Sequence, residues 1–593
     1  MRTRTRFGRT LAAICVAAAL TRAPALVAPP LLDDHVQAAM LEGRYPAPRS
    51  PFDLYAFARG DGRDRARLRA EGTLPWWTAD DYQLVMLRPL SSALVAFDHL
   101  VLRHWVLARL HSLAWACALL WAAASLMRKR AGDRAALVGA ALLAADDALT
   151  SPVVWHANRC ALVAVTLALV AVDAACDALD RRSGRRGALA VAAALGACLA
   201  GEYAWTVLPA IALYAKARHP ERASRVFAAL GALAVAYALA RSARGEGCAA
   251  ACSAPTSEEP RAAALSPSWV VERDAGRPPR GGRRRAAPRV ARRSPRAPRR
   301  PRSARCCWRS RGERRREARP TMRWALASSV APIAVVSTAW LSARLMLGAA
   351  VWSALLIATL ATAGVKGRVA RLAMIALLTL HGPVKAVATW RAASDHLRGT
   401  RRSWRGAETL LAGVPPEASL YVLNATDPEE VYFGRYTMRA RGVSTPRRWF
   451  VLASTPAAVH VFRESPRVLS IVHPRSVLDG VSARFFRSGV PWPATGARAR
   501  VGDATVTVLD GDRAGVRRLR VEFAEDLNDP SIAIVESTAS GLRRVTLPAV
   551  GGSIQLRAPR DVMLETVRPS RRPDAAGRSA SHDQPFTFPA TRE

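Results

Sequence analysis

The sequence predicts a multispan α-helical membrane bundle followed by a C-terminal β-rich extracytoplasmic domain. Half of the 593 residues are hydrophobic, yet the mean hydropathy is only +0.04, so apolar and polar stretches are segregated along the chain. The long apolar stretches all end before residue 391, and short strand-like runs follow from about residue 404. This division is typical of a membrane-embedded part joined to a soluble part.

The first candidate span, residues 11–28, follows four arginines and is interrupted by Arg22 and Pro24. Small residues after the run would also suit a cleaved signal peptide. We interpret the run as a retained helix because many further spans follow it. Its basic flank then places the N-terminus in the cytoplasm.

Nine further apolar segments approach the length of about 20 residues that a helix needs to cross hydrocarbon. The pair on either side of Glu202 is short enough to be two helices that meet at a polar turn. We expect an N-terminal bundle within residues 1–240, with an external loop at 29–106, and a second group of spans within 323–390. The nine segments are 107–126, 135–149, 153–175, 188–200, 203–215, 226–240, 325–340, 345–363 and 369–390.

Basic residues predict the orientation of the first spans. Clusters at 128–130, 181–186 and 216–225 each end a helical hairpin. From a cytoplasmic N-terminus, alternating spans place all three clusters inside, as the positive-inside rule requires. The predicted location is a bacterial inner membrane, with the C-terminal domain in the periplasm.

Residues 241–322 depart from this pattern. They contain 20 arginines between positions 271 and 320, with much Pro, Ala and Ser and no apolar run long enough to cross a bilayer. One interpretation is a disordered basic loop. The other is a stretch translated out of frame from GC-rich DNA, which would have lost one span. A restored span would place the C-terminal domain outside, whereas the arginines at 391–405 argue against that orientation.

Residues 404–568 are interpreted as a compact β-rich domain, and the polar tail at 569–593 is expected to be disordered. None of the nine cysteines lies after Cys307, so an extracytoplasmic domain would fold without disulfides. Short β-branched and aromatic runs, separated by turn residues, predict strands. These runs are 420–423, 449–452, 459–462, 504–509, 519–523 and 532–535.

The formal charge of +41 does not by itself indicate a nucleic-acid partner. Lysine occurs at only four positions, so the excess is nearly all arginine, a bias expected of a GC-rich genome. The sequence has no zinc-finger spacing, no RNP-like aromatic run and no basic-region heptad. We therefore expect membrane lipid, and no nucleic acid, as a partner.

Three acidic doublets are predicted to lie at the external face. Carboxylates beside a membrane are costly unless solvated or paired, which makes them functional candidates. One could act as a general base on an acceptor hydroxyl, and two could hold a divalent cation. The alternative for each doublet is a solvated helix cap. The doublets are Asp33 with Asp34, Asp80 with Asp81, and Asp146 with Asp147.

Positive partners are expected on the same face. His156 and Arg159 lie at the start of one span, and Arg344 precedes the span that begins at residue 345. An arginine fixed at this depth can bind a phosphate through paired hydrogen bonds. The alternative for each arginine is an interfacial anchor. Residues 84–104 are predicted to form an amphipathic helix on the membrane surface, where it could border a groove for a lipid-linked substrate.

Five short elements occur in a characteristic order. They are the acidic pair after the first span, Arg-Pro-Leu at 88–90, Leu110-His111, the run from Trp155 to Arg159, and Gly201-Glu202. In this order they resemble multispan glycosyltransferases of the GT-C fold, among them protein O-mannosyltransferases and lipid A aminoarabinose transferases. The resemblance covers roughly the first 240 residues and, more weakly, the spans around Arg344. The segment 241–322 departs from it.

The resemblance implies transfer of a sugar from a polyprenyl-phosphate-linked donor to an extracytoplasmic acceptor, and this is the leading hypothesis. The alternative is a non-catalytic membrane protein of envelope assembly, whose external domain binds a partner. By the resemblance, the base would be Asp33 or Asp34, a second acidic residue would be Asp80 or Asp81, and the donor phosphate would be bound by Arg159. His156 and Arg344 are assigned to the same phosphate.

Overall fold

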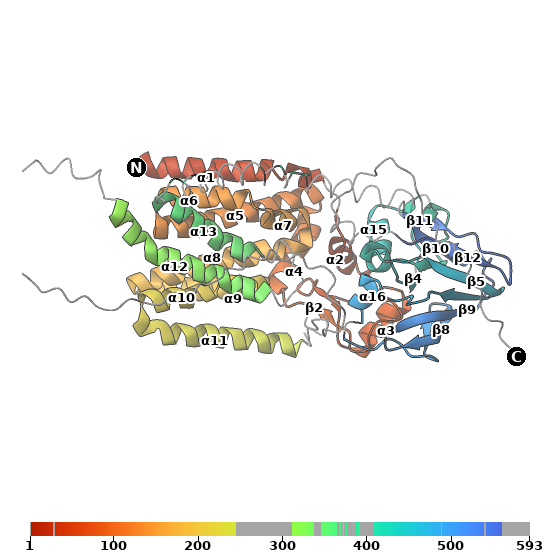
Figure 1. Ribbon diagram of the computed structural model, residues 1–593. Helices are drawn as coiled ribbons and strands as arrows, with labels where there is room; N and C mark the ends of the chain where they lie inside the picture. Colours follow the sequence, from red (N-terminus) through yellow and green to blue (C-terminus); the bar gives the residue numbers. More distant parts are fainter. Residues whose placement is uncertain are drawn as a thin grey trace, which may run out of the picture.

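The computed structural model places an elongated helical bundle beside a C-terminal region of β-sheet (Figure 1). It describes residues 2–27, 30–244, 311–336 and 346–363, single positions between 368 and 391, and residues 407–559 apart from 409, 447, 488, 539 and 540. Residues 407–559 are called the sheet region below. The predicted sequence of helices followed by strands is confirmed.

The bundle consists of helices joined by short turns. His104 caps the start of α5 by accepting the Val106 N–H, and Gly132, with a φ of 89°, forms the turn between α5 and α6. The elements are α1 (Arg2–Leu20), η1 (Ala23–Val27), α5 (Trp105–Ala131), α6 (Asp133–Ala144), η3 (Asp147–Leu149), α7 (Thr150–Val154), η4 (His156–Asn158), α8 (Arg159–Arg181), α9 (Gly184–Ala200), η5 (Glu202–Thr206), α10 (Pro209–Arg218), α11 (Pro220–Ala243), α12 (Arg311–Val336) and α13 (Leu347–Ala363).

Three helices in the described part are long and apolar enough to cross a membrane: Trp105–Ala131, His156–Arg181 and Pro220–Ala243. A fourth span forms only if Asp133–Ala144 and Asp147–Val154, which are bent by 62°, count as one broken helix. α9 and α13 have 17 residues each and α10 has 10, fewer than the about 20 that a span needs. These helices are compatible with a membrane protein that has fewer full-length spans than the sequence predicts. Most of the predicted span 369–390 lies outside the described residues.

The first predicted span ends early, at Leu20, and a buried arginine explains why. The Arg22 guanidinium donates to the carbonyl oxygens of Ala144 (2.9 Å) and Asp146 (2.8 Å), at the C-terminal end of α6. The last carbonyls of a helix have no partner within the helix and attract cations. The charge that interrupts the apolar run therefore joins α1 to α6.

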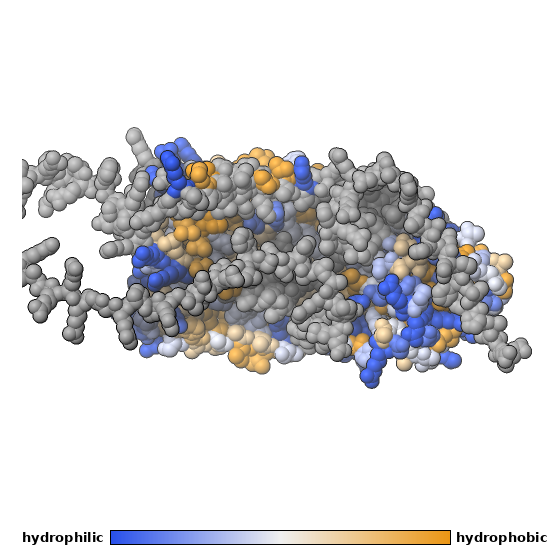
Figure 2. All heavy atoms as spheres, viewed as in Figure 1, coloured by the Kyte–Doolittle hydropathy of each residue, from blue (hydrophilic) through white to orange (hydrophobic). Residues whose placement is uncertain are grey.

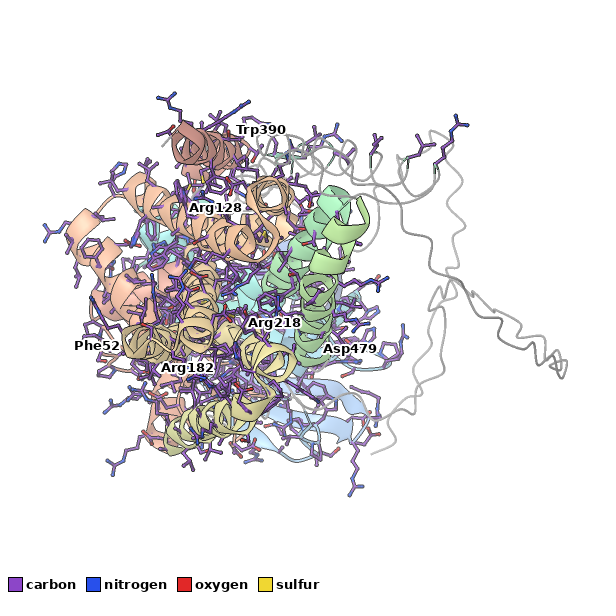
Figure 3. The ribbon with its side chains drawn as sticks, turned by 90° about the vertical axis from the view of Figure 1, so that its left-hand side faces the viewer. Phe52, Arg128, Arg182, Arg218, Trp390 and Asp479 are labelled. Atoms are coloured by element: carbon purple, nitrogen blue, oxygen red, sulfur yellow. The ribbon has the colours of Figure 1, made fainter. Side chains whose placement is uncertain are left out.

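The two ends of the bundle carry different side chains. Hydrophobic residues cover much of the visible helical surface, and hydrophilic residues gather at the end away from the sheet region and on that region (Figure 2). Figure 3 looks onto the first of these ends, where Arg128, Arg182 and Arg218 mark the basic clusters near the ends of α5, α8 and α10. We call it the basic end and the opposite one the sheet end. All three basic clusters thus share one end, as the sequence predicts.

The helices that flank residues 245–310 are anchored at opposite ends of the bundle. Arg244, after α11, forms an ion pair of 3.3 Å with Asp53, which belongs to the segment covering the sheet end. Thr321, in α12, donates to the Arg130 carbonyl at the basic end (3.1 Å). α11 therefore ends at the sheet end, whereas the part of α12 around Thr321 lies at the basic end. The sequence of residues 245–310 contains no apolar run of spanning length.

Residues 30–104 cover the sheet end and join it to the sheet region. The Trp76 indole donates to the Leu452 carbonyl (3.0 Å), and the hydroxyls of Thr73 and Tyr436 share a hydrogen bond of 2.7 Å. The predicted surface helix begins only at Pro89, a residue favoured in the first turn. The elements are α2 (Asp33–Leu41), β1 (Ala56–Ala58), α3 (Gly62–Ala70), β2 (Leu84–Val85), α4 (Pro89–Phe97) and η2 (Asp98–Leu102).

The sheet region contains a four-stranded sheet of order β11-β10-β3-β4 and a six-stranded antiparallel sheet of order β12-β5-β6-β9-β8-β7. β3 pairs in parallel with both β10 and β4. All six predicted strand runs lie within strands. The strands are β3 (Ser419–Asn424), β4 (Arg448–Ala453), β5 (Val459–Ser465), β6 (Val468–Val472), β7 (Arg498–Val501), β8 (Ala504–Asp512), β9 (Gly515–Phe523), β10 (Ile532–Thr538), β11 (Gly541–Arg544) and β12 (Ser553–Leu556).

Short helices connect the strands, and two of them, η8 and α15, contact α2 at the sheet end of the bundle. They are η8 (Glu429–Phe433), α15 (Gly434–Ala440) and α16 (Val481–Phe485). α15, which follows β3, packs against α2 at the sheet end of the bundle. This contact between two segments about 400 positions apart in sequence forms one side of the candidate site.

Candidate functional site

A cavity of about 260 Å³ lies where the sheet end of the bundle meets α15. Its walls come from α2, α4 with η2, the start of α5, η4 and α15. Ligand-binding pockets in proteins typically begin at about 300 Å³. The cavity is therefore near the lower end of the size range that holds a small molecule.

Asp34 is held from three sides at the wall of this cavity. One carboxylate oxygen accepts the Leu31 N–H (3.0 Å), and the other accepts the Ala157 N–H (2.8 Å). Nη2 of Arg109 lies 3.7 Å from the first oxygen, and both side chains are fully buried. A buried charge is tolerated only with partners of this kind. The Asp34 carboxylate is thus balanced in charge and occupied on both oxygens.

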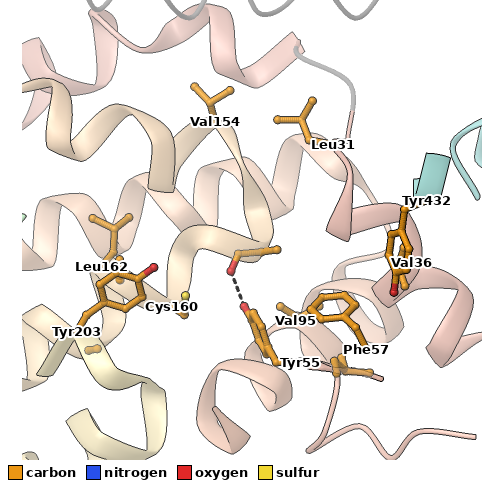
Figure 4. Close-up of a cluster of buried hydrophobic side chains, with 14 of the residues drawn as sticks. Leu31, Val36, Tyr55, Phe57, Val95, Val154, Cys160, Leu162, Tyr203 and Tyr432 are labelled. Atoms are coloured by element: carbon orange, nitrogen blue, oxygen red, sulfur yellow. Dashed lines mark hydrogen bonds between the residues drawn. The ribbon is translucent and has the colours of Figure 1, made fainter. Parts of the chain in front are cut away.

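Tyr55 binds the carbonyl of Ala157, the residue whose N–H binds Asp34. Its hydroxyl donates to the Ala157 carbonyl at 2.5 Å, the dashed line in Figure 4. The Arg88 guanidinium lies 4.9 Å from the centre of the Tyr55 ring, and its Nε donates to Glu202 (3.0 Å). Ala157, the central residue of η4, is therefore hydrogen-bonded at both its N–H and its carbonyl. These two bonds fix the position of the neighbouring His156.

Asp98, in η2, is the centre of a second buried charge cluster. One oxygen lies 2.6 Å from Nδ1 of His111, the other lies 3.1 Å from Nε2 of His156, and Arg159 forms an ion pair with it. Burial by itself would raise the pKa of Asp98, but the hydrogen bonds of the two histidines and the charge of Arg159 hold this pKa well below its usual range. Asp98 is therefore ionised at neutral pH.

Some buried polar atoms in this region have no hydrogen-bond partner within the part of the chain that the structure describes. Among them are Nδ1 of His35, Nδ1 of His156 and Nη2 of Arg159. Burial lowers the pKa of His35 to about 4 against the attraction of Asp34, so its ring is uncharged at neutral pH. Buried polar atoms normally have partners. His35 and His156 line the cavity, whereas Arg159 lies behind Asp98.

Every carboxylate that lines the cavity has a cationic partner. The remaining charge of the cavity is therefore positive, because further arginines line it. The pairs are Asp34 with Arg109, Asp98 with Arg159, and Glu42 with Arg44.

Arg103 and Arg439 line the cavity and form no ion pair with any residue that the structure describes. Burial, together with the charges of Arg435 and Arg44, lowers the pKa of Arg439. Such groups bind phosphate or carboxylate through charged hydrogen bonds. The cavity is thus suited to an anionic group.

Exposed apolar side chains lie on the same elements as the cavity. Phe97, Leu100, Val101, Leu107 and Leu110 belong to α4, η2 and the start of α5, and each is between 44% and 62% exposed. The Phe97 ring stands edge-on to His111, with 6.0 Å between the ring centres. A group of exposed apolar residues marks a site for lipid or for another apolar partner.

The structure brings together three of the predicted site residues. Asp34 and His156 line the cavity, and Arg159 is linked to it through Asp98. Asp33 is half-buried in the first turn of α2 and does not line the cavity. Arg344 lies outside the described residues.

Asp80 and Asp81 lie elsewhere. Both are exposed, Asp80 pairs with Arg69 at 3.0 Å, and the preceding Ala79 donates to the Phe486 carbonyl of the sheet region. This doublet thus lies outside the group of residues around Asp34. Asp146 follows the helix-cap alternative, since its carboxylate accepts the Ala148 N–H (2.9 Å).

Sequence reasoning missed Asp98, Arg109 and Arg439. Asp98 lies in the predicted amphipathic segment 84–104. An ionisable residue within an apolar helix is itself a functional candidate, and this signal would have identified both Asp98 and Arg109. Arg439 had no such signal, because its approach to α2 depends on contacts between distant segments.

A divalent cation does not fit these carboxylates. Within the residues that the structure describes, no three His, Cys, Asp or Glu side chains are grouped to hold a metal ion. Both oxygens of Asp34 already accept N–H donors, and a guanidinium faces one of them.

No family model and no curated protein matches the chain.

Proposed function

We propose that the chain is a membrane glycosyltransferase that transfers a sugar from a polyprenyl-phosphate donor to an extracytoplasmic acceptor. The cavity at the sheet end is the proposed site of transfer. The observation that carries this proposal is the combination of unpaired arginines, charge-balanced carboxylates and adjoining exposed apolar side chains. In this proposal the protein lies in a bacterial inner membrane with a cytoplasmic N-terminus, and the cavity opens to the periplasm.

The donor phosphate is assigned to Arg103 and Arg439, with Arg44 beside them. A phosphodiester carries one negative charge, and it becomes a monoester with more charge as the sugar departs. Guanidinium groups fixed at that position stabilise the charge that develops in the transition state. The resemblance assigned this role to Arg159, which instead pairs with Asp98 and has only Nη2 free.

The polyprenyl chain is assigned to the exposed apolar side chains of α4, η2 and α5. Phe97 and Leu107 are among them, and the residues between, His104 and Trp105, line the cavity. A lipid held there would keep its chain in hydrocarbon and place its phosphate at the cavity. A leaving group already anchored in the bilayer needs no cytosolic nucleotide.

The sugar is assigned to the space between Trp105 and Tyr436, which line the cavity. Aromatic side chains with a polar edge suit a sugar ring, which has apolar faces and a hydroxylated rim. Because the carboxylates are balanced and two arginines are not, the cavity favours a neutral or acidic sugar over a positively charged amino sugar.

In the reaction, an acceptor hydroxyl attacks the anomeric carbon of the sugar, and the bond to the phosphate oxygen breaks with its electron pair on that oxygen. A base at the cavity wall takes the hydroxyl proton. Asp34, the base that the resemblance implies, and His156 are both at this wall.

The test uses the full-length chain in lipid vesicles with radiolabelled polyprenyl phosphate linked to mannose, glucose or 4-amino-4-deoxyarabinose. We expect consumption of a neutral-sugar donor in the presence of an envelope extract as acceptor source. Arg103→Ala with Arg439→Ala should weaken donor binding by at least tenfold. Arg518→Ala, at an exposed position on β9, is the matched control and should bind donor normally.

Two results would count against the proposal. Consumption that is undiminished when Asp33→Asn and Asp34→Asn are combined would remove both proposed carboxylates. Failure of the wild-type chain to bind or consume any of these donors would favour the non-catalytic alternative, in which changes on the surface of the sheet region abolish function.

A further inference from the structure

We propose that His156, held by Asp98, is the base that takes the acceptor proton, and that Asp34 is a positioning residue for the loop that carries His156. This inference rests on the proposed glycosyl transfer and changes which residue performs its proton step. It is carried by the hydrogen-bond geometry around the two side chains.

Both carboxylate oxygens of Asp34 are engaged by backbone donors, and its side chain has no exposed surface. One oxygen accepts the Leu31 N–H at 3.0 Å, and the other accepts the Ala157 N–H at 2.8 Å. Protonation would also remove the negative charge that faces the buried Arg109 guanidinium at 3.7 Å. The contacts of Asp34 therefore stabilise η4 and leave its carboxylate poorly placed to act as a base.

His156 has the complementary arrangement. Its Nε2 lies 3.1 Å from an oxygen of Asp98, which is an acceptor, so Nε2 carries the proton. Nδ1 then carries the lone pair, and it has no partner within the described part of the chain. The side chain is only 3% exposed, and the residue lines the cavity.

The second histidine on Asp98 is arranged differently. The Trp115 indole N–H donates to Nε2 of His111 at 3.0 Å, so Nε2 is an acceptor and the proton of this ring lies on Nδ1. That proton points to Asp98, 2.6 Å away. Both nitrogens of His111 are thus engaged, and His156 is left as the histidine of this pair that can accept a proton from a ligand.

Two carboxylates and one guanidinium surround His156. Asp98 faces it from η2, Asp34 from α2 and Arg159 from α8. The Trp105 ring stands edge-on to the imidazole, with 6.1 Å between the centres, and orients it. A carboxylate that fixes one nitrogen of an imidazole while the other contacts substrate is the arrangement of a general base.

In the proposed step, His156 takes the acceptor proton as the new glycosidic bond forms. The acceptor oxygen forms a bond to the anomeric carbon as its proton moves to Nδ1 of His156. The bond between that carbon and the phosphate oxygen breaks, and its electron pair remains on the phosphate. The imidazolium then returns its proton to the departing phosphate monoester or to water, which restores the neutral ring.

The experiment compares His156→Gln and His156→Ala with wild type in the vesicle assay, with polyprenyl phosphate mannose as the first donor tested. General base catalysis contributes roughly 10²- to 10⁴-fold. We expect turnover to fall by at least 100-fold, while donor binding stays within threefold and added imidazole restores part of the activity of His156→Ala. Asp98→Asn should shift the pH dependence of turnover. The matched control is His460→Ala, at an exposed position on β5.

Asp34→Asn separates the two roles. It keeps an acceptor oxygen for one backbone N–H, so we expect a partial loss of turnover together with a lower unfolding temperature. Retention of more than half of the turnover by both His156 variants would overturn the assignment. Loss of donor binding in a folded His156→Gln protein, with no rescue by imidazole, would also overturn it, in favour of a phosphate contact. Absence of transfer by wild type would instead refute the proposed function.

Discussion

Arg109 and Asp34 face each other at 3.7 Å with no exposed side-chain surface on either residue. Removing one partner of a buried ion pair typically costs about 3–5 kcal/mol, because the other charge remains buried. We expect Asp34→Ala and Arg109→Leu each to lower the midpoint of thermal unfolding in detergent. The double variant should be less unstable than the sum of the two single variants. Asp80→Ala, at an exposed residue, is the control and should leave the midpoint unchanged.

The second prediction concerns Tyr55 and its hydrogen bond to η4. Tyr55→Phe removes the donor to the Ala157 carbonyl, a loss of about 1 kcal/mol in stability. It should also lower transferase turnover, because Ala157 lies beside His156. Tyr82→Phe is the matched control, since the buried Tyr82 hydroxyl has no partner among the described residues and no hydrogen bond is lost. Equal effects of the two substitutions would argue against a role of the hydroxyl in positioning η4.

Because His35 is buried and uncharged at neutral pH, we expect the folded protein to lose stability in mild acid. Its pKa is lowered to about 4 in the folded protein, from an ordinary value of about 6.5. The unfolded chain therefore binds a proton more readily, and stability falls as the pH drops from about 6.5 towards 4, by about 3 kcal/mol in all. Asp34 opposes this lowering, and Arg441 and Arg109 add to it.

The check on this prediction is the pH dependence of unfolding in His35→Gln. This variant should lose less stability than wild type between pH 6.5 and 4. Asp98 affects stability only at lower pH. Its lowered pKa in the folded protein adds stability, and this stability is lost only as the pH falls below the unfolded-state pKa of about 3.9. Parallel curves for wild type and His35→Gln would rule out His35 as the cause.

The anchoring of Arg244 and Thr321 at opposite ends of the bundle predicts where these positions lie in a membrane. In a background without the native cysteines, Arg244→Cys should react with a membrane-impermeant maleimide added to the periplasmic side. Arg319→Cys, at an exposed position near Thr321, should react only after the membrane is opened. Labelling of both from one side would contradict the arrangement.

If the two positions do lie on opposite sides, the chain must cross the membrane between them, and residues 245–310 as they stand contain no suitable segment. The out-of-frame interpretation then predicts that another reading frame of the gene encodes a run of about 20 apolar residues here. Translating the two alternative frames tests this. If neither contains such a run, the interpretation is wrong.

Six of the ten strands described in the sheet region could be predicted, because each is a short local pattern of β-branched and aromatic residues. The strands β6, β7, β11 and β12 were not predicted. The membrane spans were predicted less well. Arg22 ends α1 early by bonding to carbonyls of α6, and Glu202 divides α9 from α10 by pairing with Arg88. Both are contacts between distant segments, and hydropathy along the chain does not contain them.

In the candidate site too, contacts between distant segments could not be predicted from the sequence. Asp34, His156 and Arg159 were predicted as site residues, since polar groups at the ends of apolar runs stand out. Their contacts were not predicted, because Arg109 and Asp98 come from other helices. Asp80 has a signal as strong as that of Asp34, yet the segment around it folds onto Phe486, so this residue lies outside the cavity.

Because α15 supplies Tyr436 and Arg439, the cavity has walls from segments about 400 residues apart in the chain. A fragment that stops after the last helix of the bundle would leave the cavity open to water. If the proposed transfer takes place there, two fragments made separately, residues 1–244 and residues 311–593, would each be inactive, and transfer would return only when they are produced together and reassemble.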